Sequence, residues 1–237
     1  METRSIAIDG PSGAGKSTLA RMTAQKRGII YVDTGALYRS VGLYALRRGV
    51  GSKDEPGVTA LLPEIELEMK YGDAGDLRVL LCGEDVTEEI RIPEASIYAS
   101  DVSALPAVRA FLLQTQRDMA VRGDVIMDGR DIGTVVLPNA GVKIFLTAQP
   151  EIRARRRYDE LIAAGRAVTY DDVLRDINYR DKNDSSRAAA PLKAAEDAVV
   201  FDTTELDLNE SFLRLIELID EGLSAKGEIR YKDDAAI

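Results

Sequence analysis

The sequence predicts an α/β fold of three layers, in which helices cover both faces of a five-stranded parallel sheet. Short aliphatic or β-branched runs alternate with helical patterns along the chain, as in successive βα units. A polar or turn-forming cluster follows each run, which is typical of buried parallel strands. A chain of 237 residues, of which 45% are hydrophobic and 30% charged, is long enough to form one domain around a core.

The core elements follow in order. Strands are expected at the aliphatic runs 5–8, 29–32, 125–127, 142–146 and 198–201. Helices are expected at 16–26, 36–47, 107–121, 151–163, 170–184 and 208–223, where apolar residues recur at helical spacing. The last helix carries Leu208, Phe212 and Leu215 on one stripe, so we interpret it as a helix that packs on the core.

The region between residues 49 and 104 breaks this alternation. Two expected strands, 65–70 and 78–82, flank a Gly/Asp-rich turn at 71–76, a pattern typical of a hairpin. We therefore expect an inserted antiparallel piece between the second and third core strands, within a single domain that covers residues 1–225. Residues 226–237 are polar and aperiodic, and we expect them to form a C-terminal tail.

Composition excludes several classes of chemistry. The chain has no histidine and one cysteine, Cys82, which excludes His-based catalysis, a disulfide framework and a Cys-rich zinc site. A net charge of −9 argues against general binding to nucleic-acid polymers or anionic membranes. Neither a membrane span nor a basic-then-apolar leader is found, so a cytoplasmic location is expected. Residues 151–193, however, hold ten Lys/Arg and eight Asp/Glu, a local net of +2 (10 − 8) that predicts a confined anion site.

A phosphate-binding loop is predicted directly after the first strand. Gly10-Pro11-Ser12-Gly13-Ala14-Gly15-Lys16-Ser17 fits G-x-x-x-x-G-K-[S/T] in full and opens a helix. The glycines let successive backbone N–H groups point inward, and Lys16 supplies a mobile charge for the β- and γ-phosphates. The Ser17 hydroxyl is a hard oxygen ligand for Mg²⁺, and Asp128 ends the third core strand beside the loop as its partner. The fold is therefore predicted to be a P-loop fold that binds a nucleoside triphosphate with Mg²⁺.

A second ligand is predicted at the same edge of the sheet. The segments 33–39 and 128–133 each leave the carboxyl end of a strand, where open α/β sheets bind ligands. Arg39 lies about one turn into its helix and could reach an anion there. The adjacent Arg130 and Asp131 leave one loop in different directions, as a structural ion pair would not require.

Two later helices add charge to this side. Val173, Ile177, Arg180, Asp184 and Arg187 share one helix face, so that a buried apolar stripe becomes charged. A charge that continues a buried stripe is costly unless a ligand satisfies it. On the preceding helix three arginines share a face, which suits the spread negative charge of a migrating phosphoryl group; they are Arg153, Arg156 and Arg157.

Together these segments resemble the bacterial cytidylate kinases, a family of nucleoside monophosphate kinases, over essentially the whole chain except the tail. The segments that carry the resemblance are 10–17 (GPSGAGKS), 33–39 (DTGALYR), 83–91 (GEDVTEEIR), 128–136 (DGRDIGTVV) and 187–192 (RAAAPL). The resemblance implies transfer of the γ-phosphate of ATP to CMP or dCMP by a monomer. Residues 36–112 would form an enlarged monophosphate-binding region, and 151–166 a helical lid that closes over ATP.

The resemblance also implies residue roles, matched by position. ATP would be bound by Gly10, Pro11, Ser12, Gly13, Ala14, Gly15, Lys16, Ser17, Thr18, Arg153 and Arg156, and Mg²⁺ by Ser17 and Asp128. Cytosine would face Thr34 (a serine in some relatives), Ser100, Arg109 and Asp131; the monophosphate would face Arg39, Arg130 and Arg187; and the sugar would face Arg180 and Asp184. Catalysis would rest on Lys16, Arg130, Arg157 and Arg187.

The chemistry of the acceptor agrees with these implied roles. Asp131 would accept from the cytosine N4 amino group, and Arg109 would donate to N3 and O2, whereas uracil reverses both polarities. A phosphate oxygen is already largely deprotonated at pH 7, so no histidine base is needed. Two alternatives stay open. One is a P-loop kinase that phosphorylates a small-molecule hydroxyl with Asp33 as base, and the other is a binding protein that uses ATP only as a switch.

Overall fold

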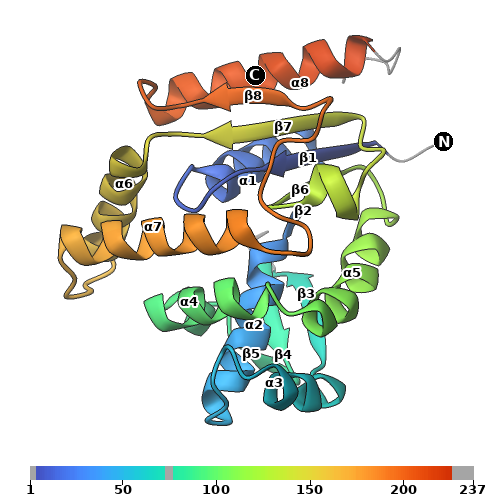
Figure 1. Ribbon diagram of the computed structural model, residues 1–237. Helices are drawn as coiled ribbons and strands as arrows, with labels where there is room; N and C mark the ends of the chain where they lie inside the picture. Colours follow the sequence, from blue (N-terminus) through green and yellow to red (C-terminus); the bar gives the residue numbers. More distant parts are fainter. Residues whose placement is uncertain (1–3, 73–76, 226–237) are drawn as a thin grey trace.

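The computed structural model describes residues 4–72 and 77–225, and its centre is a five-stranded parallel sheet with the strand order β2-β6-β1-β7-β8 (Figure 1). The strands are β1 (Ser5–Asp9), β2 (Ile30–Asp33), β6 (Val125–Gly129), β7 (Val142–Thr147) and β8 (Val199–Asp202). The predicted fold class is confirmed. Residues 73–76 of the predicted turn and the predicted tail lie outside the described residues.

The register of the sheet determines where its polar residues meet. Asp33 at the end of β2 pairs with Asp128 in β6, and Asp9 at the end of β1 pairs with Gly129. Because parallel strands end at the same edge, the segments that follow β1, β2 and β6 leave the sheet side by side. This edge therefore collects the phosphate loop and both segments predicted to bind a second ligand.

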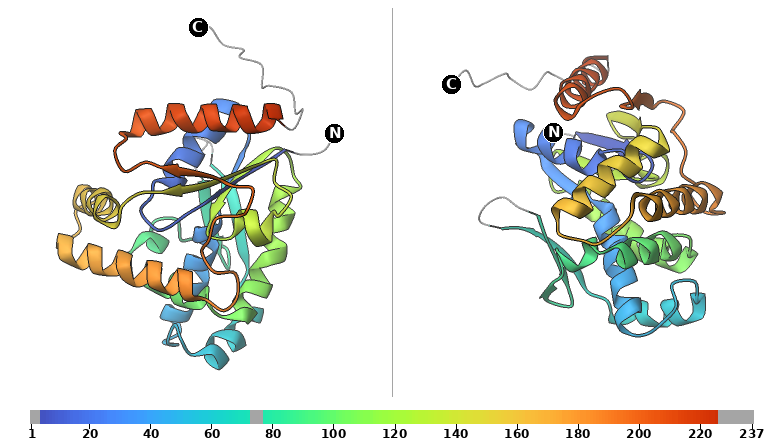
Figure 2. Two further views of the ribbon diagram at one scale, coloured as in Figure 1. Left: turned by 45° about the horizontal axis from the view of Figure 1, so that its top comes forward. Right: turned by 90° about the vertical axis from the view of Figure 1, so that its left-hand side faces the viewer.

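Helices cover both faces of the sheet, as Figures 1 and 2 show. On one face, α1 (Lys16–Arg27) and α8 (Leu208–Ala225) bury side chains such as Leu19 and Leu215 in a cluster with Ile8. On the other face, α2 (Thr34–Arg47) and α5 (Pro106–Ala120) bury Leu37 and Leu112. Alternate strand residues feed the two clusters, since successive side chains of a strand point to opposite faces.

The inserted region contains more structure than the sequence predicts. Its antiparallel sheet has three strands, β3 (Leu67–Tyr71), β4 (Leu77–Leu81) and the short β5 (Glu84–Asp85), which pairs back onto β4. The helices around it are α3 (Glu55–Leu61), the 3-10 helices η1 (Leu62–Glu64) and η2 (Glu89–Arg91), and α4 (Pro93–Val102). Pro93 suits the first turn of α4, where no N–H donor is needed. At Gly42 of α2 an added Cβ would lie 2.9 Å from Tyr98 Cβ, so glycine lets α4 pack closely on α2.

The remaining helices are α6 (Pro150–Ala163) and α7 (Tyr170–Ser186), which we call the α6–α7 arm (residues 150–186). The arm has a small apolar cluster of its own, formed by Ala154, Leu161, Val173 and Ile177. Between β6 and β7 the chain forms a π-helical turn, η3 (Ile132–Val136). Across the described ranges, no helix combines the length and the apolar character that a membrane crossing requires.

Candidate functional site

A cavity of about 500 Å³ opens at the carboxyl edge of the sheet. The phosphate loop, the start of α2, the loop after β6, α4 and the α6–α7 arm all contribute to its wall. Many of the lining side chains are cationic, namely Lys16, Arg21, Arg39, Arg91, Arg130, Arg157, Arg166, Arg180 and Arg187. In a protein of net charge −9 this is a local concentration of positive charge, which favours a polyanionic ligand.

The phosphate loop has the backbone that its glycines predict. Gly10 has a φ of 149°, and a Cβ built there would lie 1.9 Å from the carbonyl oxygen of Leu146 in β7, so only glycine fits. Lys16 is buried, and its Nζ donates to the Pro11 carbonyl oxygen at 2.8 Å. Burial, followed by the nearby charge of Arg130, lowers the pKa of Lys16. An anion in the loop would reverse both penalties and stabilise the ammonium.

Beside the loop lies a set of oxygen atoms that fits a hard cation. Ser17 Oγ donates to Asp128 Oδ2 at 2.9 Å, and the Tyr31 hydroxyl donates to Asp128 Oδ1 at 2.9 Å. Burial and the charge of Asp33 raise the pKa of Asp128 to about 6. A buried carboxylate of this kind gains from a nearby cation. Mg²⁺ is commonly held by one or two carboxylates and the phosphates of its substrate, and this donor set fits it.

The start of α2 contributes a carboxylate that is already engaged. Asp33 caps the helix, accepting from the Ala36 N–H at 2.9 Å through one oxygen and from Arg39 at 2.8 Å through the other. The Arg39 Nε is buried and has no hydrogen-bond partner among the residues described. Arg39 is thus oriented by Asp33 and keeps a donor for a ligand.

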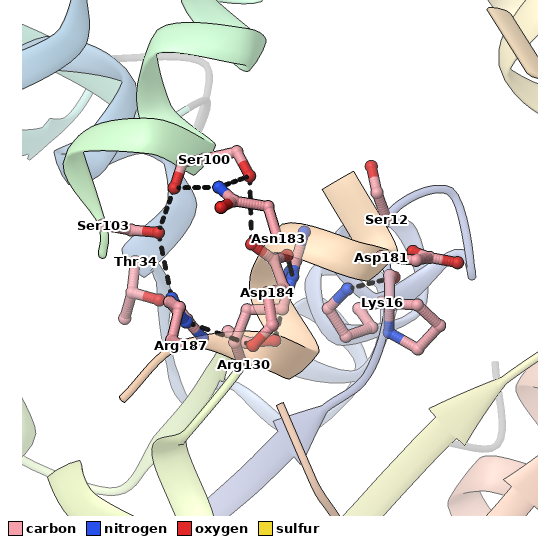
Figure 3. Close-up of polar contacts among 12 residues, drawn as sticks. Ser12, Lys16, Thr34, Ser100, Ser103, Arg130, Asp181, Asn183, Asp184 and Arg187 are labelled. Atoms are coloured by element: carbon pink, nitrogen blue, oxygen red, sulfur yellow. Dashed lines mark hydrogen bonds and ion pairs between the residues drawn. The ribbon is translucent and has the colours of Figure 1, made fainter. Parts of the chain in front are cut away.

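A polar network joins the loop after β6 to α4 and α7 (Figure 3). Arg130 Nε donates to Asp184 Oδ2 at 2.8 Å, and Ser100 Oγ donates to Asp184 Oδ1 at 3.1 Å. Arg187 donates to Ser103 Oγ at 2.9 Å through one terminal nitrogen, while the other is buried without a partner in the described chain. The network positions two guanidinium groups at the cavity wall.

Arg180 is a cation of the site whose charge the protein only partly neutralises. Its Nε is buried with no hydrogen-bond partner within the described ranges. Burial and the charge of Arg130 lower the pKa of its guanidinium to about 10. Clustered guanidinium groups without enough carboxylates are unfavourable in a buried setting. A ligand with hydrogen-bond acceptors would therefore supply what Arg180 lacks in this setting.

Another part of the site carries a pair of opposite charges. Arg109 of α5 forms an ion pair with Asp131 and also donates to the Ser103 carbonyl oxygen at 3.3 Å. Burial raises the pKa of Asp131, and the Arg109 charge opposes that effect. Nearby, Thr34 Oγ1 donates to the Asp128 carbonyl oxygen at 2.7 Å. An acceptor beside a donor is the pattern needed to read the edge of a nucleobase.

Most of the predicted site residues line this cavity, but not all do. The exceptions are Gly10, Pro11, Ala14, Arg109, Arg153 and Arg156. Arg109 reaches the site through Asp131. Arg156 bonds to the hydroxyl and carbonyl oxygens of Thr203 at 3.1 and 2.7 Å, and Arg153 is 3% exposed and enclosed by protein. Their roles at ATP therefore stay predictions.

Sequence reasoning missed several polar residues of the site. Arg21 lies one helical turn after Ser17, a spacing that could have identified it. Asp9 accepts from the backbone N–H groups of Ile132 and Gly133 at 2.7 and 2.8 Å, which holds the loop after β6 against the end of β1. The contacts of Asp9 arise from the fold, because its partners lie more than 120 positions away in the chain.

Comparisons with known proteins agree with this geometry. The family model described as cytidylate kinase matches residues 6–221. The cytidylate kinase of Pelotomaculum thermopropionicum is 49% identical over 217 residues, which cover 92% of this chain and 96% of that protein. That of Carboxydothermus hydrogenoformans is 49% identical over 214 residues, covering 90% and 96%, and that of Bacillus licheniformis is 45% identical over 216 residues, covering 91% and 96%.

Proposed function

The chain belongs to the cytidylate kinase family, and from this premise we propose that it transfers the γ-phosphate of ATP to CMP or dCMP, which yields ADP and CDP or dCDP. One observation carries the proposal. A single cavity has a phosphate loop at one side and only partly neutralised guanidinium groups at the other, with the Arg109–Asp131 pair beside them. Such a cavity fits two anions placed end to end, one of which carries a base that is read by its edge.

On the donor side, the loop N–H groups and Lys16 would bind the phosphates of ATP. Ser17 and Asp128 would hold Mg²⁺, since their oxygens lie together at the loop. When bound, the ion would neutralise charge on the β- and γ-phosphates. The amino group of Lys16, which donates to Pro11 in this structure, would turn to the phosphates, where its charge is better stabilised.

On the acceptor side, Arg39, Arg130 and Arg187 would hold the monophosphate of CMP. Each has either an oriented ion pair or a buried unpartnered donor. The attacking atom would be a phosphate oxygen, which needs no general base because the second pKa of a phosphomonoester is about 6. Arg157 lines the cavity from the arm, where its guanidinium donates to Glu160 at 3.1 Å and to the Arg91 carbonyl oxygen at 3.3 Å; it would turn from these partners to the transferring group. Positioning and charge neutralisation thus supply the catalysis.

Asp131 and Arg109 would select the base. The Asp131 carboxylate would accept from cytosine N4, while Arg109 donates to N3 and O2. Ser100 and Thr34 would complete the base side, and Arg180 and Asp184 would contact the sugar. With uracil, a carboxylate would face O4 and a guanidinium would face the N3–H donor. Each mispaired contact of this kind costs about 1–3 kcal/mol.

The geometry argues against the two alternative functions. A hydroxyl acceptor would need Asp33 as a base, whereas in this structure Asp33 has a positioning role, because it caps α2 at the Ala36 N–H and pairs with Arg39. A binding protein that uses ATP as a switch would have no need for a second anion site, which Arg39, Arg130 and Arg187 would provide. We further propose that the protein works as a monomer in the cytoplasm, where both nucleotides are available.

A coupled assay of ADP formation tests the proposal. Wild-type protein with ATP and Mg²⁺ is offered CMP, dCMP, UMP, AMP or shikimate, each at the same concentration. We expect CMP and dCMP to be the preferred acceptors, and Lys16→Ala to abolish turnover with every acceptor. Phosphorylation of shikimate, together with a loss of turnover in Asp33→Asn, would show a hydroxyl kinase. ATP binding without turnover of any acceptor would show a switch.

A further inference from the structure

Arg153 of α6 makes a buried junction between the phosphate loop and α7. Its Nε donates to the Ala148 carbonyl oxygen at 2.8 Å, and one terminal nitrogen donates to the Ser12 carbonyl oxygen at 2.9 Å. The two terminal nitrogens also donate to the two carboxylate oxygens of Asp181 at 3.1 and 2.6 Å. In this structure 3% of the Arg153 surface is exposed, and all three guanidinium nitrogens are engaged by protein oxygens.

The loop and the arm are also in direct contact at Gly13. A Cβ built on Gly13 would lie 3.1 Å from Arg153 Cβ and 3.4 Å from Ile177 Cδ1. Gly13 therefore allows α6 and α7 to pack against the loop backbone. A displacement of the loop would therefore displace the arm as well, because protein interiors are close-packed and transmit strain.

The end of α7 that Arg153 holds is the end that faces the acceptor. Asp181 lies directly after Arg180, which lines the cavity, and three residues before Asp184. Asp184 bonds to Arg130 and Ser100, and Tyr179 donates to Asp101 of α4 at 2.5 Å. Within about two turns, α7 thus contacts the donor loop through Arg153 and the acceptor side through Tyr179 and Asp184.

The hydrogen bonds of the loop suggest how a bound triphosphate would act on Arg153. Two successive loop carbonyls are held by cationic side chains, Pro11 by Lys16 and Ser12 by Arg153. When a triphosphate enters, Lys16 is expected to leave the Pro11 carbonyl for the phosphates. The next carbonyl along the loop, that of Ser12, is the one that Arg153 holds. A movement of the loop at Pro11 would therefore shift Arg153 and its partner Asp181.

We propose that Arg153 is a positioning residue that links the occupied phosphate loop to α7 through Asp181, so that binding of ATP tightens binding of CMP. This inference rests on the proposed function and adds to it. It gives Arg153 another role than the direct ATP contact that the sequence predicts, and its support is that the hydrogen bonds of Arg153 go to protein oxygens of Ala148, Ser12 and Asp181. A linkage of this kind is reciprocal, so CMP tightens ATP by the same factor.

The test measures the affinity of CMP with and without the donor site filled. Isothermal titration calorimetry gives the CMP dissociation constant in the absence and presence of a saturating non-hydrolysable ATP analogue with Mg²⁺, and the ratio is the coupling factor. Couplings between sites are commonly about 5- to 150-fold. The variants are Asp181→Asn, which keeps the shape of a side chain that does not line the cavity, and Arg153→Lys, which keeps the charge and loses the planar guanidinium.

We expect a wild-type coupling factor of about fivefold or more, and a factor close to one in both variants. The CMP dissociation constant without the analogue should change by less than about threefold. The control is Arg155→Ala, since Arg155 lies on the same helix but only stacks on Tyr158 and Tyr170, with its guanidinium carbon 5.6 and 4.8 Å from their ring centres. This variant should keep the wild-type factor.

The outcomes separate the possible errors. A wild-type factor of one, or variants that keep the wild-type factor, would overturn the linkage while CMP phosphorylation still stands. If Arg153→Lys weakens ATP alone while Asp181→Asn is silent, then Arg153 binds ATP directly and the linkage is wrong. If CMP neither binds to the wild type nor is phosphorylated, the proposed function fails, and the linkage fails with it.

Discussion

At the scale of the residue, the site is a set of cations that the protein itself only partly neutralises. Asp33, Asp131 and Asp184 each pair with an arginine of the site. These pairs orient Arg39, Arg109 and Arg130. Among the residues that the structure describes, buried donor atoms of Arg39, Arg180 and Arg187 find no acceptor. Preorganised donors of this kind bind an anion without the cost of ordering flexible side chains. In the proposed reaction these carboxylates would therefore orient the arginines without taking part in the phosphoryl transfer themselves.

Replacement of Asp131 by alanine should remove most of the preference for CMP over UMP. The contact with cytosine N4 is lost, and so is the unfavourable contact with uracil O4, which together correspond to roughly 5- to 150-fold in specificity. The measurement is the ratio of kcat/KM for CMP to that for UMP, because partial unfolding cancels in it. Asp118→Ala, an exposed carboxylate on the same helix as Arg109, should leave the ratio unchanged. An unaltered ratio in Asp131→Ala would remove this residue from base reading.

Asp9 should make stability depend on pH in a predictable direction. Burial raises its pKa from 3.8 to about 6, so the folded protein holds this proton over a range where the unfolded chain has lost it. The cost of ionising Asp9 is absent below about pH 4 and complete above about pH 6, and a shift of this size corresponds to roughly 3 kcal/mol. Relative to Asp9→Asn, which does not titrate, the wild type should therefore lose stability as the pH rises from 4 to 6.

Urea unfolding of both proteins at several pH values measures this difference. Any loss from the altered hydrogen bonds to Ile132 and Gly133 is a constant offset, because the asparagine does not change with pH. A difference in the free energy of unfolding that stays flat, or that changes in the opposite direction, would contradict the assignment.

The sequence predicts which types of residue form the site better than it predicts the contacts that those residues make. The phosphate loop, Asp128 and the segment from Gly129 to Gly133 can be recognised because each follows a strand directly. The position of Arg153 cannot be predicted in this way. Helical spacing places it on the same face of α6 as Arg157, yet only Arg157 lines the cavity. Only the packing of α6 on the loop buries one arginine and leaves the other near solvent.

At the scale of the element, the carboxyl ends of the core strands determine where the site lies, and helices and the loops beside them supply many of its side chains. The five core strands could be predicted to within one or two residues, because buried parallel strands are short aliphatic runs with clear polar ends. The third inserted strand and α4 could not, since β5 has two residues and α4 is a short helix with a weak apolar pattern. Both depend on tertiary contacts, α4 through its close packing on α2.

Two glycines at the ends of neighbouring elements should respond differently to alanine. Gly10 follows β1, and a Cβ there would collide with the Leu146 carbonyl oxygen of β7. Gly28 ends α1 with a φ of 64°, and a Cβ there would have no heavy atom within 4 Å. Gly28→Ala should cost only the left-handed strain, about 1–2 kcal/mol. Gly10→Ala adds an overpacked backbone contact of about 1–3 kcal/mol and should also weaken ATP.

Urea unfolding and titration with the ATP analogue check this pair of variants. Gly28→Ala is the matched control, because it carries backbone strain without the collision and lies away from the loop. Equal losses of stability in the two variants, or full ATP affinity in Gly10→Ala, would contradict the close approach of the loop to β7.

At the scale of the whole molecule, three apolar clusters divide the protein into parts of unequal strength. The two large clusters lie on the two faces of the central sheet, whereas the α6–α7 arm depends on the small cluster of Ala154, Leu161, Val173 and Ile177. Local stability follows the apolar surface that a unit buries, so the arm is expected to open more readily than the sheet. The arm also carries Arg157 and Arg180, so ligands that bridge the cavity would hold it closed.

Hydrogen exchange should show this difference directly. In the ligand-free protein, the amides of α6 and α7 should exchange at least about tenfold faster than those of β1 and β6, because a gap of about 1.4 kcal/mol in local opening gives that factor. Together, CMP and the ATP analogue should slow exchange in the arm, since they would supply acceptors to Arg157 and Arg180. The amides of α8, which packs on the opposite side of the sheet from α2, are the internal control and should not change. An arm that exchanges as slowly as β1, or that gains no protection when both nucleotides are bound, would mean that the arm is a fixed part of the core and does not close over the ligands.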